Sequence, residues 1–256
     1  MARYQLILAY DGTDFFGFQR QGNSRTVQSV VEKALQGLGW QEESILFAGR
    51  TDSGVHASGQ VISFELDWQH SNADLLNALN AKLPADAAVR NIAQVEADFH
   101  PRYDASSRSY VYRIYQAAQR DPLQERYAWR VWPQLDAALL NAAAERFLGR
   151  HDFAAFGRPM KPGSTTTREV FESAWIATPR GWEYHVSANA FLYHMVRRLV
   201  FVQVEIARGG LPLEVLQAGF AQPKALHPGL APAHGLTLEH VAYGPNTQGS
   251  LEEDEN

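Results

Sequence analysis

Residues 48–57 read AGRTDSGVHA, a short polar run in which glycines lie on either side of a single acid, Asp52. The apolar residues 45–48 lead into it, and residues 60–66 after it alternate between apolar and polar side chains. This arrangement predicts two strands joined by a loop that displays Asp52. Glycines let the backbone turn tightly and let a ligand approach closely. Taken alone, the pattern favours a plain turn, because Asp and Ser are ordinary turn formers.

Outward from this loop, the first half of the chain alternates strands and helices. Residues 3–10 and 89–95 are expected strands. Thr26 is a suitable N-cap for a helix that ends at Gly39, and a second helix ends at Pro84. With the two strands that flank the loop, the predicted order is β-α-β-β-α-β.

The second half repeats that order without obvious sequence similarity. Its expected elements are a strand at residues 108–115, a helix at 136–148, a hairpin of strands at 168–176 and 182–188, a long helix at 191–208, a short helix at 213–220 and a strand at 236–241.

Two successive split β-α-β units predict an α+β fold made of two ferredoxin-like (β-α-β-β-α-β) halves. We expect these halves to form one continuous, mainly antiparallel sheet with helices on one face. The domain prediction is residues 1–104 for an N-terminal half that carries the catalytic Asp loop and 105–244 for a C-terminal half. Residues 245–256 form an acidic tail that is expected to be disordered.

Composition narrows the class of protein without identifying it. The chain has 256 residues and no cysteine, which excludes disulfides, thiolate zinc sites and cysteine nucleophiles. It shows no signal-peptide pattern and no long apolar run, so we expect a cytoplasmic protein with no membrane partner. The net charge is −5, but four acids lie in the tail, which leaves −1 for the rest. A near-neutral body with 19 Arg and four Lys can bind nucleic acid if its charges are segregated.

Three runs carry a resemblance to a known family. They are GRTDSGVHA at residues 49–57, YDGTDFFGFQRQ at 10–21 and FLYHMVR at 191–197. With further matching segments over the whole folded body, they resemble the TruA family of tRNA pseudouridine synthases. The resemblance implies that Asp52 is the essential catalytic carboxylate. Phe18 departs from the pattern, because the family commonly has Trp there.

Tyr110 lies in the expected strand SRSYVYRIY, at residues 107–115, and matches the family's active-site tyrosine. Most strand tyrosines simply pack against neighbouring strands. A uracil that has left its stack, however, needs a flat partner, and stacking on an aromatic ring stabilises a base by about 1–3 kcal/mol. We therefore predict that Tyr110 stacks on the substrate base.

Arg197 ends the FLYHMVR run and matches the family's arginine. On a helical wheel it falls at the margin of the apolar face, whereas Arg198 is expected to point into solvent. Without the motif, a surface arginine with a packed stem would be the simpler interpretation. Desolvation drives a carboxylate in a base pocket toward its neutral form, and an adjacent guanidinium opposes this. We predict that Arg197 keeps Asp52 ionised from a distance of about 3–5 Å.

Two further residues are predicted to bind substrate. Arg50, two positions before Asp52, either holds an RNA phosphate before the base enters or braces the loop, and the sequence leaves both roles open. Leu236 lies in APAHGL, at residues 231–236, which also matches the family, and is expected to wall the pocket.

The sequence predicts neither a metal site nor a cofactor. Asp11 and Asp14 have Gly12 between them and no third ligand nearby, so they indicate a turn. The nine histidines are scattered without ligand spacing and are expected at the surface or in ordinary packing. No glycine-rich nucleotide-binding run is present.

The resemblance implies a cofactor-free, homodimeric isomerase that converts uridine to pseudouridine in the anticodon stem-loop of tRNA, at positions 38–40. Because Asp52 belongs to the first half and Tyr110 and Arg197 to the second, the cleft should lie between them. RNA should then cover the sheet face opposite the helices. The alternative is a non-catalytic RNA-binding module, since β-α-β-β-α-β is also the order of RRM folds. A metal-dependent hydrolase would need more ligands than Asp11, Asp14 and Asp52 supply.

Overall fold

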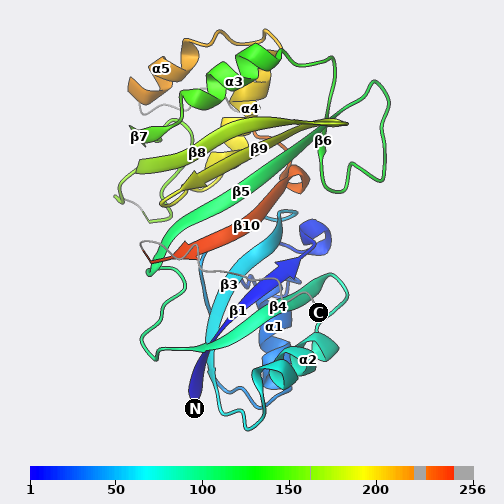
Figure 1. The fold of residues 1–256 in the computed structure, drawn as a ribbon, viewed down its shortest axis with the longest axis vertical. Coiled ribbons are helices and arrows are strands. Elements are labelled where there is room, and N and C mark those ends of the chain that lie inside the picture. Colours follow the sequence, from blue (N-terminus) through cyan, green and yellow to red (C-terminus); the bar gives the residue numbers. More distant parts are fainter. Residues whose placement is uncertain (162, 222–228, 245–256) are drawn as a thin grey trace, which may run out of the picture.

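The computed structural model describes residues 1–161, 163–221 and 229–244, and the predicted tail at 245–256 lies outside them. The described residues form a single sheet with the strand order β4-β1-β3-β10-β5-β9-β8-β7 (Figure 1). Two short strands lie off this path, β2 beside β3 and β6 beside β5. Among the helices of this described part, none has the length and apolar character needed to cross a membrane.

The first half has the predicted β-α-β-β-α-β order. Its elements are β1 (Ala2–Tyr10), α1 (Val27–Gln36), β2 (Leu46–Phe47), β3 (His56–Leu66), α2 (Asn72–Lys82) and β4 (Ala87–Val95), with a single 3-10 turn, η1 (Gly12–Asp14), after β1. The predicted N-cap of α1 is confirmed. The Thr26 hydroxyl accepts a hydrogen bond from the Ser29 N–H, and the Ser29 hydroxyl accepts one from the Thr26 N–H.

The second half contains every predicted element and three more, the strands β6 and β7 and the turn η2. Its elements are β5 (Ala105–Gln116), β6 (Trp129–Val131), α3 (Ala137–Glu145), β7 (Gly149–Asp152), β8 (Thr167–Thr178), β9 (Gly181–Ala188), α4 (Met195–Ala207), α5 (Val215–Ala221), the 3-10 turn η2 (Ala233–Gly235) and β10 (Leu236–Tyr243). The sequence pattern does not predict β6 and β7. They are three and four residues long, too short for any alternation to show.

The long helix α4 begins at Met195, four residues later than predicted. The preceding segment is held out of the helix by a bridge between Tyr193 and Arg158, in which each backbone N–H donates to the other carbonyl, at 2.9 and 3.3 Å. His194, directly before the helix, has φ 65°, which is left-handed. A long-range contact therefore overrides a helical sequence pattern here.

The last strand joins the two halves edge to edge. β10 pairs in parallel with β3, through Thr237 opposite His56 and Leu238 opposite Ala57, and antiparallel with β5. This confirms a continuous, mainly antiparallel sheet. It also brings the chain just after the Asp52 loop next to the start of β10. The division of the chain into domains at residue 104 stays a prediction.

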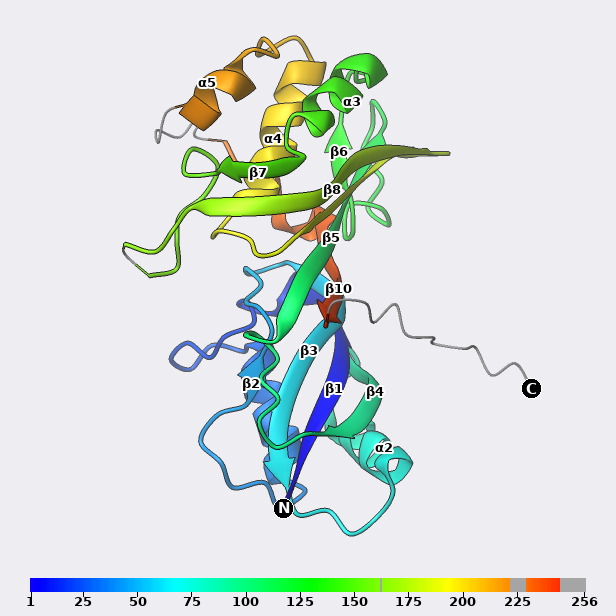
Figure 2. The same cartoon turned by 60° about the vertical axis from the view of Figure 1, so that its left-hand side comes forward.

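All five of these helices cover one face of the sheet (Figure 2). On this face, residues that lie opposite one another on neighbouring strands are buried, as one pair from each half illustrates. In the first half Leu6 pairs with Ile62 and packs with α1 and α2. In the second, Tyr112 pairs with Tyr184 and packs with α3 and α4. The opposite face is polar around Arg113, which pairs with two carboxylates. The helices-on-one-face prediction is confirmed.

Candidate active site

The Asp52 loop packs against residues 10–21, the run YDGTDFFGFQRQ. The backbone N–H of Phe18 donates to the carbonyl of Thr51 at 3.1 Å. At Gly12, a Cβ would lie 2.0 Å from the carbonyl oxygen of Val55, so no side chain fits where the two segments cross. Residues 10–21 therefore pack against the loop and fix the position of Asp52.

Asp52 and Arg197 meet across the two halves at the predicted distance. The Arg197 Nη1 donates to Asp52 Oδ2 at 2.9 Å, and the Arg197 Nε donates to the carbonyl of Ala231 at 2.7 Å. The two side chains are 22% and 14% exposed, so the pair is shielded yet still reachable. Because Arg197 lies in the first turn of α4, the helix dipole adds to the positive potential at the carboxylate.

Arg198 does not point freely into solvent, contrary to expectation. It is only partly exposed, and its Nε is buried without a hydrogen-bond partner among the described residues. Burial, together with the nearby guanidinium of Arg158, lowers the pKa of the Arg198 side chain. The bridge that pulls Tyr193 out of the helix also brings Arg158 to this side of α4.

Tyr110 and Leu236 both line the same cleft as Asp52. The Tyr110 ring meets the ring of Phe191 edge to face, with centroids 5.1 Å apart. Burial raises the pKa of Tyr110 to about 12, so its phenol is neutral at physiological pH. Leu236 is the first residue of β10 and lies opposite Tyr112. The structure thus brings both residues to the cleft, and their roles as stacking partner and wall stay predictions.

Arg50 also lines the cleft, and its side chain is exposed. No hydrogen bond or ion pair of Arg50 occurs within the part of the chain that the structure describes. Of the two roles left open by the sequence, bracing of the loop finds no contact to support it. An exposed guanidinium at the cleft is free to meet an incoming phosphate.

Arg108 is a cleft residue that the sequence analysis missed. Its guanidinium meets no carboxylate of the described residues and instead donates to four backbone carbonyls, those of Ala48, Arg102, Ala105 and Asn189. Burial lowers its pKa below the ordinary arginine value. The side chain therefore joins three separate segments around the cleft. Its position two residues before Tyr110, on the same strand face, could have identified it.

Of the histidines, His56 matches the expectation of a packed, hydrogen-bonded residue, whereas His194 lies at the cleft beside Asp52. The Nε2 of His194 lies 3.4 Å from Asp52 Oδ2. His56 accepts a hydrogen bond from the Gly12 N–H on Nδ1 and contacts the carbonyl of His234 through Nε2, at 3.0 and 3.1 Å. Because Nδ1 accepts, it carries no proton, and burial accordingly lowers the pKa of His56.

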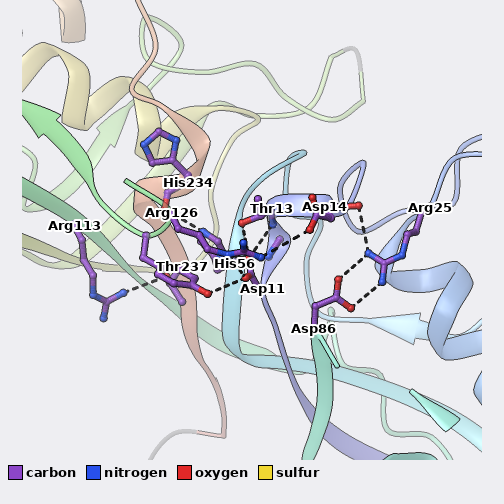
Figure 3. A network of polar contacts seen from close by, with 12 residues as sticks. Asp11, Thr13, Asp14, Arg25, His56, Asp86, Arg113, Arg126, His234 and Thr237 are labelled. Atoms are coloured by element: carbon purple, nitrogen blue, oxygen red, sulfur yellow. Dashed lines mark hydrogen bonds and ion pairs between the residues drawn. The ribbon is translucent and has the colours of Figure 1, made fainter. Parts of the chain in front are cut away.

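The carboxylate of Asp11 belongs to a network beneath the loop (Figure 3). It accepts from the backbone and hydroxyl of Thr13, from Arg126 Nε at 2.7 Å and from the Tyr127 hydroxyl at 2.8 Å. Asp14 lies 3.8 Å from the same arginine. These contacts explain the Asp11–Asp14 spacing as a capped turn. The described residues contain no group of three potential metal ligands.

The cleft has a volume of about 830 Å³ and is lined by both halves. It combines four guanidinium groups, those of Arg50, Arg102, Arg108 and Arg197, with the single acid Asp52. Large apolar side chains are also exposed at it: Phe16 at 61%, Tyr103 at 73%, Tyr193 at 46% and Met160 at 43%. Exposed aromatic rings beside cations suit a ligand with flat bases and phosphates.

The cleft opens on the helix-bearing side of the sheet. Tyr110, which lines it, pairs with Leu238 and Val186 on the face that the helices cover. The cleft therefore lies between the two helix groups. The expectation that RNA covers the opposite face does not fit this position, because it assumed that helices fill their whole side of the sheet.

Comparison with known proteins places this α+β chain in a class of RNA-modifying isomerases. A family model described as tRNA pseudouridine synthase matches residues 6–104 and 143–244. The chain belongs to this family, and it is an isomerase that acts on tRNA. Membership in an enzyme family rules out the alternative of a non-catalytic RNA-binding module.

Several curated relatives are similar over nearly their whole length. The protein of Syntrophotalea carbinolica is 42% identical over 247 residues, which covers 96% of this chain and 98% of that protein. That of Staphylococcus aureus (strain MRSA252) is 37% identical and covers 93% and 91%. Both are named tRNA pseudouridine synthase A. A solved structure, "Crystal Structure of a Cbf5-Nop10-Gar1 Complex", is 12% identical with a TM-score of 0.34; the alignment covers 78% of this chain and 45% of that one, and carries no argument.

Proposed function

We propose that this chain converts uridine to pseudouridine in the anticodon stem-loop of tRNA, with Asp52 as the reacting carboxylate. Arg197 is its charge partner, and Tyr110, Arg50 and Leu236 bind the substrate. The observation that carries the proposal is the 2.9 Å contact of Asp52 with Arg197, formed between the two halves in a cleft lined by Tyr110.

The chemistry needs an ionised carboxylate beside the sugar of the target. The C1′–N1 bond breaks, the base rotates, and a C1′–C5 bond forms, while a proton leaves C5 and one is taken up at N1. Asp52 acts either as a nucleophile or as a base in this sequence. In both routes the guanidinium of Arg197 favours the ionised form. The neutral ring of Tyr110 offers a flat surface to the detached uracil.

The cleft surface supports a target in a loop or at a stem edge. The target base must leave its stack before it can reach Asp52, and this costs least where the base is unpaired or terminal. The exposed rings of Phe16, Tyr103 and Tyr193 can stack on neighbouring unpaired bases. Arg50 and Arg102 can meet phosphates of the same strand. An anticodon arm supplies such nucleotides.

We also propose a homodimer that works in the cytoplasm. A single cleft has little room to hold an anticodon arm and the body of tRNA together, so a second copy would supply the remaining contacts. The cytoplasm is where tRNA is at hand.

One experiment tests the target. The protein is incubated with unmodified tRNA, pseudouridine is labelled with a carbodiimide, and stops of reverse transcription are mapped. We expect stops confined to the anticodon stem-loop, and none with the Asp52→Asn variant. Stops in another arm would overturn the proposed target, and equal stops with the variant would overturn the role of Asp52.

A further inference from the structure

His194 stands beside the carboxylate in an unusual backbone conformation. Among the described residues it alone, glycines aside, has a positive φ, at 65° with ψ 5°. This left-handed conformation is unfavourable for a residue with a Cβ. It persists only when the surroundings impose it, and such residues concentrate at functional sites.

The surroundings that impose it are visible in the loop before α4. The Tyr193 ring stacks on the His194 ring, with centroids 3.7 Å apart and planes at 24°. Backbone hydrogen bonds in both directions join Tyr193 to Arg158. At Gly157, a Cβ would lie 2.6 Å from the Cβ of Leu192, so this glycine permits the close packing. The imidazole is therefore held in place before any substrate arrives.

The contacts of Asp52 fall on one of its two oxygens. Oδ2 receives the Arg197 Nη1 at 2.9 Å and lies 3.4 Å from the His194 Nε2. No hydrogen bond to Oδ1 occurs among the described residues. A carboxylate held at one oxygen keeps the lone pairs of the other available for reaction.

We propose that His194 is a positioning residue: its imidazole packs beside Oδ2 of Asp52, which Arg197 binds, and so leaves Oδ1 as the oxygen that acts on the nucleoside. The proposal rests on the proposed role of Asp52. It adds that the orientation of the carboxylate depends on a neighbour that titrates.

The charges around His194 keep it neutral. The groups that face it are the carboxylate of Asp52 and the guanidiniums of Arg197, Arg198 and Arg158. Burial and the three cations lower the pKa of His194, and Asp52 only partly opposes them. When the pH falls through that lowered value, the imidazolium pairs with Oδ2 and weakens the carboxylate as a nucleophile or base. Activity then falls on the acid side as His194 takes up its proton.

The test replaces His194 without disturbing the backbone. Asn and Gly both accept the left-handed conformation, and neither titrates. For His194→Asn and His194→Gly we expect a single-turnover rate about ten- to a hundredfold lower at neutral pH, with unchanged tRNA affinity. We also expect the acid limb of the pH–rate profile to move to lower pH, because the inactivating protonation is gone.

A matched control exists on the polar face of the sheet. His185 Nε2 lies 3.3 Å from a Glu183 oxygen, and its side chain is 27% exposed against 25% for His194. His185→Asn should retain the wild-type rate and profile. A wild-type rate in the His194 variants would overturn the proposal, and so would a lower rate with an unmoved acid limb, which indicates a structural role only. Full activity of Asp52→Asn in the same assay would remove the proposed function itself.

Discussion

Two aspartates, Asp11 and Asp52, lie on adjoining loops, and each has a histidine and an arginine within reach. Asp11 has both oxygens occupied, Oδ1 by two donors of Thr13 and Oδ2 by Arg126 and Tyr127. Burial alone would raise the pKa of Asp11, but these hydrogen bonds outweigh it and hold that pKa well below the usual range. Within the described ranges, the carboxylate of Asp52 accepts a hydrogen bond at Oδ2 and none at Oδ1.

The difference shows what distinguishes a structural carboxylate from a reactive one in this protein. Each carboxylate has a histidine and an arginine nearby, so these two neighbours do not by themselves make an aspartate reactive. A carboxylate whose lone-pair sites are all filled by protein donors is structural, since it has no lone pair available for a substrate. Only Asp52 lines the cleft. Substitutions at the two positions should therefore separate activity from stability.

The largest effect is expected at Asp52. Asp52→Asn keeps the shape of the side chain but removes the charge, and an amide serves neither as nucleophile nor as base. We expect the single-turnover release of tritium from C5-labelled uridine in tRNA to fall at least about a thousandfold. Binding of tRNA and the melting temperature should change little. A rate within tenfold of wild type would show that Asp52 does not take part in the reaction, and the contrast with Asp11 would no longer hold.

The next effect is expected at the arginine that holds Oδ2. Arg197→Met should lower the rate about a hundredfold, whereas Arg198→Met should lower it by less than about fivefold, because only Arg197 touches the carboxylate. Arg197 is one of the cations that lower the pKa of His194, so its loss should raise that pKa and move the acid limb of the pH–rate profile upward. That is the opposite direction to the shift expected for the His194 variants. Equal behaviour of the two arginine variants would contradict the pairing.

Local sequence patterns account for much of the fold. Alternation over 3–10 and the cap at Thr26 are local signals, and the structure confirms both elements. For the pairing of β10 with β3, the sequence predicted only that the two halves share one continuous sheet, because the two strands are far apart in the sequence. The late start of α4 was not predicted, since it depends on the bridge from Arg158 to Tyr193.

The candidate site divides in the same way. Asp52, Tyr110 and Arg197 were found because short runs around them resemble a family. His194 lies inside one of those runs, three residues before Arg197, yet the spacing of the histidines gave no reason to select it. Its role depends on a left-handed backbone conformation, which the sequence of a non-glycine residue does not predict.

A smaller effect is expected at Arg50, a cation with no structural partner in the described part of the chain. Arg50→Ala should weaken tRNA binding several-fold and leave the melting temperature unchanged. If it contacts one phosphate, the slope of log affinity against log salt should become shallower by about 0.7–0.9. Filter binding at several salt concentrations measures this. An unchanged slope with a lower melting temperature would return Arg50 to the role of a loop brace.

The smallest effect on activity is expected at Asp11, where the comparison predicts a change in stability instead. Asp11→Asn removes the charge that Arg126 and Tyr127 bind, and should lower the free energy of unfolding by about 1–3 kcal/mol. Single-turnover activity at 25 °C should stay within about threefold of wild type, because both oxygens already face protein donors.

The sign of the pH dependence follows from the lowered pKa of Asp11 in the folded state. Its stabilisation is complete above the unfolded value, near 4, and is lost as the pH falls through the folded value. Chemical denaturation of both proteins from neutral to acid pH should therefore show a stability gap that narrows on acidification. A gap that is constant with pH, or a loss of activity as large as that of Asp52→Asn, would mean that the two aspartates do not differ in kind.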